Sequence, residues 1–213
     1  MKNIIKKFSS DLNSKFYFDY DTSKNVWFRT GGKVDVFCIV YDEIELSIIL
    51  NSIGKVPYKV IGAGSNVLIR DGGYFGIIFK LGKKFNDIHL KKSSLEVGAA
   101  ILDVNLSKFA ALNKITNFEF FSGIPGTIGG AIKMNAGCFG FETKDILNKV
   151  KIINKNGKII TLGKDELKLS YRNSNLSEGD VITSANFNVA YGNNDAIKKR
   201  MSEIKELREK KQP

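Results

Sequence analysis

Histidine and cysteine are almost absent from this chain of 213 residues, and their scarcity excludes several kinds of catalytic site. The single histidine is His89, and the two cysteines, Cys38 and Cys138, lie far apart in the sequence. A zinc site, a Ser-His-Asp triad and a Cys-His pair all need such residues close together, so we predict no metal site. We expect His89 to be a packed or surface residue and the cysteines to be buried thiols of a cytoplasmic protein. If the protein is an enzyme, we expect a cofactor to carry its chemistry.

Long apolar runs are also missing. No stretch of about 18 apolar residues occurs, so we expect no transmembrane helix and no membrane partner. The first residues, MKNIIKKFSSDLNSKF, carry lysines but neither the long apolar stretch nor the small-residue cleavage site of a signal peptide. With 43% apolar and 26% charged residues, the composition is typical of a globular protein with a substantial core.

Arginine is scarce for a chain with a net charge of +11, because only 5 of the 33 basic residues are arginine. Recognition of bases and phosphates favours the two-pronged guanidinium, and the lysines here are scattered without any long block. We therefore expect no nucleic-acid partner. A basic nucleic-acid-binding protein remains an alternative, and it predicts strongly salt-dependent DNA affinity. The mild positive field is suited to attracting a phosphorylated substrate.

Glycine, by contrast, is concentrated in two apolar segments. VIGAGSNVLIRDGG (60–73) resembles half of a Rossmann fingerprint, but Val67 stands at its last position and a β-type run follows instead of a helix. Its backbone N–H groups can still form a phosphate-binding nest, or simply a tight turn. FFSGIPGTIGGAIKMNAG (120–137) resembles a helix that starts at Pro125 and receives a phosphate, or a helix packed closely on a strand. Together the two loops suggest a diphosphate held from both sides.

The remaining pattern predicts an α+β protein with two lobes and a boundary near residue 83. Alternation and turn residues predict strands at 33–41, 58–61, 94–97 and 179–191, and two strands within 67–81 joined at 71–73. Helical spacing predicts helices at 43–53 and 101–115. We also predict a hairpin at 149–162, with positive φ angles at both Asn156 and Gly157.

The last residues predict a helix capped by Asn193 or Asn194. Its apolar face consists of Ile197, Met201, Ile204 and Leu207. Because the sequence stops at Pro213, directly after this helix, we expect the face to dock on a part of the protein that the chain does not contain. An uncovered face of this kind predicts that the isolated chain self-associates.

Five motifs in order identify the chain as a member of a known family. They are WFRTGGKVDVF (27–37), VIGAGSNVLIRDGG (60–73), EFFSGIPGTIGGAIKMNAGCFG (119–140), LSYRNS (169–174) and REKKQP (208–213). This series resembles the UDP-N-acetylenolpyruvoylglucosamine reductases, or UDP-N-acetylmuramate dehydrogenases, of the MurB family. The resemblance covers the chain from about Val26 to its last residue.

The resemblance implies an FAD-dependent oxidoreductase of peptidoglycan synthesis, with FAD bound non-covalently in the two-lobed fold of the vanillyl-alcohol-oxidase/PCMH type. NADPH reduces the flavin, a hydride passes to UDP-N-acetylglucosamine enolpyruvate, and a side chain protonates the product. By motif, the residues implied to surround FAD are Arg29, Thr30, Gly62, Ala63, Gly64, Ser65, Asn66, Val67, Pro125, Gly126, Thr127, Gly129, Gly130, Ala131 and Ile182.

The same resemblance implies that Arg172 is catalytic, since a guanidinium beside the substrate carboxylate spreads the charge that develops as the hydride arrives. Tyr171 is implied to help place it, and Lys211 to meet the substrate diphosphate. For Lys211 the alternative is one more lysine on a basic helix end.

The resemblance also implies a domain organisation. We expect an N-terminal extension at 1–25, FAD-binding lobes at 26–82 and 83–192, and at 193–213 a helix that leads to a substrate-binding domain. In the family, that third domain supplies a serine proton donor, in a Gly-Ser-x-Phe-Lys-Asn-Pro segment, and later a catalytic glutamate. This sequence contains neither that segment nor the part of the domain that carries the glutamate. We therefore expect a C-terminally truncated chain. An FAD-binding module without full turnover is the alternative, and a complementing fragment is a possible partner.

Overall fold

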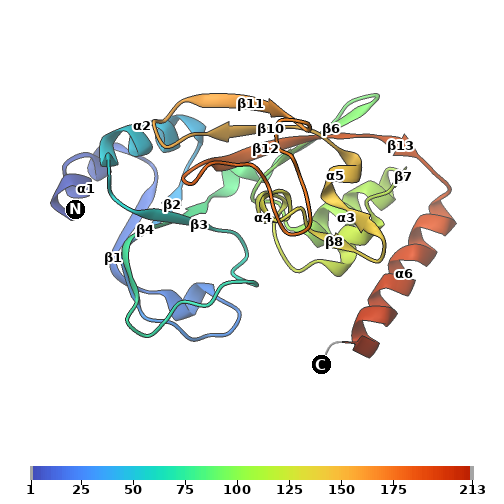
Figure 1. The fold of residues 1–213 in the computed structure, drawn as a ribbon, viewed down its shortest axis with the longest axis horizontal. Helices are drawn as coiled ribbons and strands as arrows, with labels where there is room; N and C mark the ends of the chain where they lie inside the picture. The colour runs from blue at the N-terminus through green and yellow to red at the C-terminus, as the bar shows by residue number, and fades with distance from the viewer. Residues whose placement is uncertain (1, 212–213) are drawn as a thin grey trace.

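The structure, a computed structural model, describes residues 2–211 and contains two main β-sheets that form two lobes (Figure 1). The first lobe has a four-stranded sheet in the order β1-β2-β4-β3, in which β2, β4 and β3 run parallel and β1 is antiparallel to β2. Its strands are β1 (Lys15–Asp21), β2 (Lys33–Val40), β3 (Tyr58–Ile61) and β4 (Tyr74–Leu81). The helices of this part are α1 (Lys2–Phe8), η1 (Ser9–Asp11), η2 (Thr22–Asn25) and α2 (Glu43–Ile53).

Helix α2 has the bounds that its sequence predicts. The side chain of Asp42 accepts a hydrogen bond from the backbone N–H of Glu45 at 2.9 Å, which caps the first turn. Gly54 ends the helix with a φ of +58°, in the left-handed region that glycine adopts at little cost. The face between these caps buries Leu46, Ile49 and Leu50 in the first lobe, so α2 crosses from β2 to β3 over one face of the sheet.

The second lobe has a five-stranded antiparallel sheet in the order β11-β10-β12-β6-β5. Its strands are β5 (Ile88–Leu90), β6 (Ser94–Gly98), β10 (Leu147–Ile153), β11 (Ile159–Gly163) and β12 (Val181–Asn188). Two small ladders pair β7 (Ile115–Thr116) with β13 (Ala190–Tyr191), and β8 (Gly137–Cys138) with β9 (Phe141–Glu142). The helices are η3 (Lys83–Phe85), α3 (Asp103–Leu112), η4 (Glu119–Gly123), α4 (Ile128–Lys133), α5 (Thr143–Ile146) and α6 (Asn194–Lys211).

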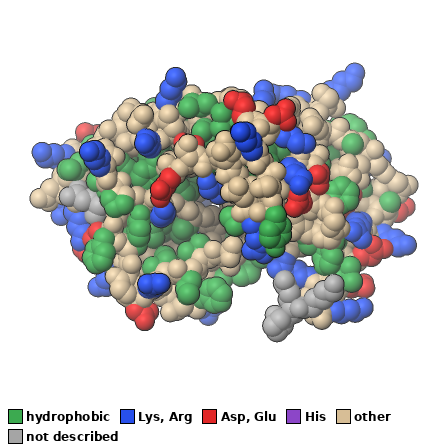
Figure 2. Space-filling view, viewed as in Figure 1, with side chains coloured by type: hydrophobic (Ala, Val, Ile, Leu, Met, Phe, Trp, Pro, Cys, Tyr) green, Lys and Arg blue, Asp and Glu red, His purple; other side chains and the backbone are tan. Residues whose placement is uncertain are grey.

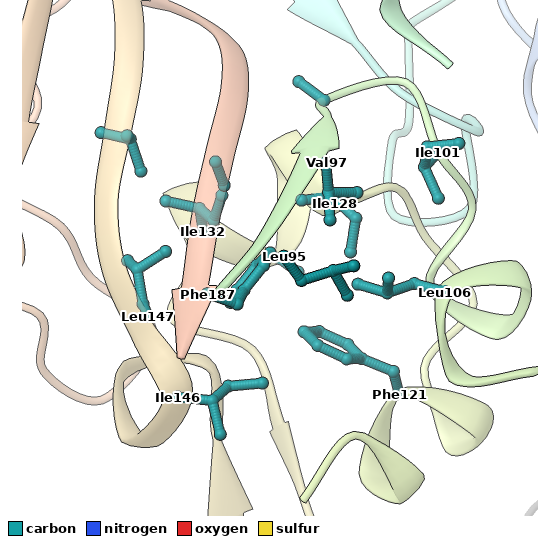
Figure 3. Packing of buried hydrophobic residues seen from close by; sticks show 14 of the residues in the cluster. Leu95, Val97, Ile101, Leu106, Phe121, Ile128, Ile132, Ile146, Leu147 and Phe187 are labelled. Carbon is teal, nitrogen blue, oxygen red and sulfur yellow. The ribbon is translucent and has the colours of Figure 1, made fainter. Parts of the chain in front are cut away.

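Helices α3, α4 and α5 pack on one face of this second sheet and form the larger core (Figure 3). Phe121 and Phe187 meet edge to face with ring centroids 6.2 Å apart, and Leu95 and Ile132 close the space around them. The glycine-rich segment at 120–137 therefore runs through the second lobe's core, and its apolar residues serve packing.

The connection from β4, in the first sheet, to β5, in the second sheet, spans residues 82–87. Strand β1, from the expected N-terminal extension, is the edge strand of the first lobe's sheet. The lobes are joined through the carboxylate of Glu43, which accepts a hydrogen bond from Oγ1 of Thr183 at 2.5 Å and pairs with Nζ of Lys151 at 3.2 Å. Hence the lobes lie against each other along α2, β10 and β12 (Figure 1).

Two local predictions were wrong. Residues 67–70 form no strand, because their main chain does not pair with a long neighbouring segment. Instead, the carbonyl of Arg70 accepts hydrogen bonds from the N–H groups of Gly32 and Gly73 at 3.0 and 2.8 Å. The β10–β11 hairpin exists, but only Gly157 has a positive φ, of +72°. Its turn begins at Asn154, whose carbonyl accepts from Gly157 at 2.8 Å, so Asn156 stays in an ordinary conformation.

The expected destination of the C-terminal helix was also wrong. Asn193 is the cap, since its Oδ1 accepts from the N–H groups of Asp195 and Ala196 at 2.9 and 3.1 Å. The apolar face of α6 packs on η4 and α3 of the same chain, and Ile197 and Ile204 are 2% and 1% exposed. The centre of the face is therefore covered within the chain, whereas Met201 and Leu207 are partly exposed.

The histidine and the two cysteines agree only in part with the environments expected for them. His89 lies exposed on β5, opposite Glu96 of β6. Both cysteines are free thiols; Cys38 is buried, whereas Cys138 is only partly buried, because it lies in the short β8–β9 ladder near the surface. Within residues 2–211, no helix combines the length and the apolar character needed to cross a membrane.

Candidate functional site

A cavity of about 740 Å³ lies between the two lobes. This volume is in the range that binds small molecules and cofactors. The first lobe contributes β3 and the loop after it, with Lys80 and Leu81 of β4. The second lobe contributes residues from the segments at 99–103, 124–136 and 176–182. Of the residues implied to surround FAD, those from Gly62 to Val67, those from Pro125 to Ala131 and Ile182 line this one cavity.

The first glycine loop presents backbone donors to the cavity. The structure gives no acceptor within residues 2–211 for the N–H groups of Gly62 to Val67. The loop is nevertheless fixed: the carbonyl of Gly64 accepts from Trp27 N–H at 3.0 Å, and the hydroxyl of Ser65 donates to the carbonyl of Pro125. Gly64 has a φ of +72°, in the left-handed region, and a left-handed residue among successive free N–H groups is typical of an anion-binding nest. This arrangement is suited to binding an anion.

The two glycine loops also touch each other, and this contact requires a glycine. A Cβ atom on Gly62 would lie 2.3 Å from Oγ1 of Thr127, which is far inside van der Waals contact. Thr127 is buried, so its side chain has little room to move away. Any side chain at position 62 would therefore push the two glycine loops apart.

The second loop differs from the prediction in how its helix begins. Helix α4 starts at Ile128, three positions after Pro125, and its first N–H groups are already used: Ile128 donates to the carbonyl of Ile101 and Gly129 to that of Ala99, both at 2.9 Å. A Cβ on Gly129 would lie 3.2 Å from both Cβ and O of Ala99. Gly129 therefore allows close packing of α4 on the segment after β6, which was the alternative to a phosphate-binding helix start. The free backbone N–H groups that could bind an anion come mainly from the first glycine loop.

Gly130 has a different environment from Gly129. It is exposed and lines the cavity, and the nearest atom to a Cβ placed there is Oγ1 of Thr127 at 3.7 Å, an ordinary contact distance. The consecutive glycines therefore divide two tasks. Gly129 lets α4 approach the segment after β6, and Gly130 leaves space in the cavity.

Two contacts connect the lobes beside the cavity. Lys59 of β3 pairs with Glu178 at 2.8 Å, and the hydroxyl of Tyr58 donates to the carbonyl of Gly179 at 2.6 Å. The segment at 176–182, which carries both partners, also holds Ile182 at the start of β12. Sequence reasoning identified Ile182 alone in this segment, because nothing in the local pattern marks the others as facing the opposite lobe.

Asp103, the first residue of α3, is a further residue of the cavity wall that sequence reasoning missed. It is fully buried, and within residues 2–211 neither carboxylate oxygen has a hydrogen-bond partner. Its backbone N–H donates to the carbonyl of Gly126 at 3.1 Å. The first turn of a helix favours a negative charge. Complete burial without a partner outweighs this effect and raises the pKa of Asp103 to about 8.

This pKa predicts how stability depends on pH. The folded chain keeps a proton on Asp103 that the unfolded chain loses above its ordinary pKa of 3.8, so stability falls as pH rises from about 4 to about 8. Asp103→Asn removes this loss. We expect it to raise the free energy of unfolding at pH 7 by about 2–4 kcal/mol, and to give no such gain near pH 4.

Urea unfolding of the cofactor-free chain at the two pH values measures this effect. Ser107→Ala is the control, because Ser107 lies one turn further along α3 and its hydroxyl is also buried without a partner in the described chain. Removing a neutral hydroxyl should change stability equally at both pH values. An equal effect of Asp103→Asn at pH 4 and pH 7 would contradict the assignment.

The residues implied to handle the substrate lie in a loop beside the cavity. Tyr171 is 79% exposed, Arg172 is also exposed with a φ of +51°, and neither belongs to the cavity lining. The guanidinium carbon of Arg172 lies 5.9 Å from the centre of the Tyr171 ring. The loop is held to the end of α4: Ser174 Oγ donates to the Lys133 carbonyl at 2.8 Å, and Asn135 Nδ2 to the Ser170 carbonyl at 3.2 Å.

The other implied residues lie outside the cavity lining. Arg29 and Thr30 are exposed, in the loop after Trp27, and Arg29 has a φ of +50°. This loop meets the first glycine loop through the Trp27–Gly64 hydrogen bond. Lys211 is the last residue of α6, and its side chain lies outside the described residues. On the face shown in Figure 2, lysine and arginine side chains are spread around the molecule without forming one patch.

Known proteins share this fold. The sequence model of the FAD binding domain family matches residues 35–163. The fold is also that of 6-hydroxy-D-nicotine oxidase from Arthrobacter nicotinovorans, with a TM-score of 0.62, 18% identity and coverage of 84% of this chain and 43% of that one. The chain thus has the two-lobed FAD-binding fold of the vanillyl-alcohol-oxidase/PCMH type that the motifs imply.

Proteins with higher sequence identity to this chain identify its family within this fold. UDP-N-acetylenolpyruvoylglucosamine reductase from Pelagibacter ubique is 40% identical over 211 residues, which cover 98% of this chain and 70% of that protein. The same enzyme from Rickettsia conorii is 41% identical over 203 residues, with coverage of 95% and 69%. The crystal structure of UDP-N-acetylenolpyruvylglucosamine reductase from Thermus caldophilus superposes with a TM-score of 0.82 at 29% identity. The match covers 95% of this chain and 71% of the Thermus chain. The chain belongs to the UDP-N-acetylenolpyruvoylglucosamine reductase family.

Proposed function

We propose that this chain binds FAD non-covalently in the cavity between its lobes and reduces UDP-N-acetylglucosamine enolpyruvate to UDP-N-acetylmuramate, with NADPH as the hydride donor, in peptidoglycan precursor synthesis. The observation that carries the proposal is the row of N–H groups from Gly62 to Val67 on the wall of the cavity. Family membership supports the same function, because the relatives are named for this reduction.

The residues of the cavity fit FAD. The N–H groups of the first glycine loop, with the Ser65 and Asn66 side chains at its tip, bind the diphosphate. Pro125, Gly126, Thr127, Gly130 and Ala131 form the opposite wall, which the chain keeps almost free of side-chain bulk. Ile182 contacts the adenine end, and Arg29 and Thr30 lie at the outer side of the first glycine loop.

Bound FAD supplies hydride transfer, and the chain's own residues orient the substrate. Arg172 places its guanidinium against the substrate carboxylate, where two parallel hydrogen bonds fix the geometry. The Ser174–Lys133 hydrogen bond ties the loop that carries Arg172 to α4, so the guanidinium keeps a fixed position relative to the cavity wall. Tyr171 supports the guanidinium from one side, and Lys211 reaches the substrate diphosphate.

An FAD-binding module without full turnover is the second candidate. The observation that favours it is that the cofactor loops line a complete cavity, whereas Arg172 and Tyr171 are exposed beside it. The chain also covers 70% and 69% of the length of the two reductases. Under this candidate the chain binds FAD and accepts electrons from NADPH but does not pass them to the substrate.

One absorbance experiment tests both candidates. The purified chain is loaded with FAD, reduced with NADPH without oxygen and then mixed with UDP-N-acetylglucosamine enolpyruvate. Return of the oxidised flavin band, with formation of UDP-N-acetylmuramate, supports the reductase. A flavin that stays reduced supports the module, and a chain that binds no FAD contradicts both.

A further inference from the structure

The lining of the cavity includes a lysine whose ammonium group makes only a weak contact, Lys80 of β4. Its Nζ lies 3.4 Å from Oδ1 of Asn25, which is longer than an ordinary hydrogen bond. The other lysines of the lining have closer partners: Lys59 pairs with Glu178 at 2.8 Å, and Lys133 donates to a backbone carbonyl at 3.1 Å. Within residues 2–211, no carboxylate forms an ion pair with Lys80.

Lys80 lies beside the start of the first glycine loop. In the parallel ladder of β3 and β4 its partner is Ile61, the residue directly before Gly62. Partners in a ladder extend their side chains to the same face of the sheet, and both residues line the cavity. Lys80 is next to the last residue of β4, and ligands of parallel sheets bind beyond the carboxyl ends of the strands.

Asn25 connects the same ammonium group to the glycine loop by a second route. Its backbone carbonyl oxygen lies 2.0 Å from the position that a Cβ on Gly64 would take, so Asn25 packs directly on the loop. Its Nδ2 donates to the hydroxyl of Tyr20 at 2.8 Å, which fixes the amide with Oδ1 toward Lys80. The ladder and this contact together place the ammonium group next to the N–H groups of the loop.

A diphosphate on this loop needs a positive charge as well as backbone donors. Backbone N–H groups carry partial charges only, and a buried anion without a charged partner loses much of its solvation energy. The lysine ammonium has three donors and no acceptor, and it binds phosphate as a point charge. Because Lys80 is partly buried, water and salt screen such a pair less than they do at the surface.

We propose that Lys80 binds the diphosphate of FAD, and that it exchanges its weak contact with Asn25 for an ion pair at the first glycine loop. This inference rests on the proposed function, because it takes FAD as the occupant of the cavity. It assigns a cofactor-binding role to a residue outside the five sequence motifs. The loop N–H groups fix the geometry of the diphosphate, and Lys80 supplies the charge.

Titration of the cofactor-free chain with FAD and with riboflavin, followed by flavin fluorescence, tests the proposal. Lys80→Met keeps an unbranched apolar stem and loses the charge. It should raise the Kd of FAD about 10- to 100-fold and leave the Kd of riboflavin, which has no phosphate, unchanged. Lys80→Arg keeps the charge and should retain most of the FAD affinity. Lys83→Met is the control, since Lys83 is exposed outside the cavity lining.

Lysine methylation with formaldehyde and a borohydride reagent, followed by peptide mass spectrometry, gives a readout that needs no variant. It therefore tests the proposal even if Lys80→Met does not fold. FAD should slow the methylation of Lys80, because an ammonium group paired with a diphosphate is no longer free to react. Riboflavin should protect Lys80 less than FAD does, and neither compound should change the methylation of Lys83.

Three results would overturn the assignment: an unchanged FAD affinity in folded Lys80→Met, an equal loss of FAD and riboflavin affinity in that variant, or equal methylation of Lys80 with and without FAD. In each of these cases the unchanged chain still binds FAD, so the proposed function survives. If the unchanged chain binds no FAD, the inference and the proposed function both fail.

Discussion

Gly130→Leu is expected to lower FAD affinity by at least about 100-fold, or about 2.7 kcal/mol, while the cofactor-free chain stays as stable as before. Gly130 is exposed on the cavity side of α4, and a Cβ there meets nothing closer than 3.7 Å. A leucine side chain therefore extends into the space that the cofactor needs. Replacing a helical glycine also gains up to about 1 kcal/mol of helix propensity, so no loss of stability is expected.

The neighbouring Gly129→Leu is the matched comparison. A Cβ at this position lies 3.2 Å from two atoms of Ala99, so leucine must push α4 away from the segment after β6. We expect a loss of about 1–3 kcal/mol in the free energy of unfolding, as for other overpacked sites. FAD binding should weaken here as well, but together with stability.

Flavin fluorescence titration and urea unfolding of the two variants separate these effects. Loss of FAD affinity at full stability in Gly130→Leu supports the cavity as the cofactor site. Unchanged affinity in that variant would mean that FAD binds elsewhere. Equal destabilisation in both variants would mean that both glycines serve packing alone.

Arg172→Lys is expected to slow substrate-dependent oxidation of the flavin about 100- to 1,000-fold and to leave FAD affinity unchanged. Lysine keeps the positive charge but cannot form two parallel hydrogen bonds with a carboxylate. Within residues 2–211 no carboxylate forms an ion pair with Arg172, so the guanidinium can meet a substrate without breaking an existing contact. Because the residue lies outside the cavity lining, the cofactor should not sense the change.

Stopped-flow absorbance of the NADPH-reduced chain mixed with substrate measures this rate. Arg200→Lys is the control: Arg200 pairs with Glu203 at 3.2 Å and donates to the carbonyl of Phe139 at 3.1 Å, so it holds α6 and has no expected task in the reaction. Normal kinetics in Arg172→Lys would remove Arg172 from the mechanism. Loss of FAD from that variant would place the residue in the cofactor site.

Local chemistry in the sequence determined much of the fold. Asp42 and Gly54 set the two ends of α2, because a cap and a left-handed glycine act within one turn of the helix. Alternation predicted β2, and the glycine segments marked the residues that line the cavity from both lobes. The motif resemblance identified the family and the fold class before any contact was known.

Tertiary structure decided what depends on residues far apart in the chain. The apolar face of α6 has the same sequence whether η4 or another domain covers it, and only packing shows that Ile204 lies against Gly123 of this chain. The first N–H groups of α4 are used by Ala99 and Ile101, which no local pattern reveals. Asp103 resembles any acidic first residue of a helix until the second glycine loop closes over it and removes it from water. Each of these features arises where distant segments meet, and sequence periodicity carries no information about that meeting.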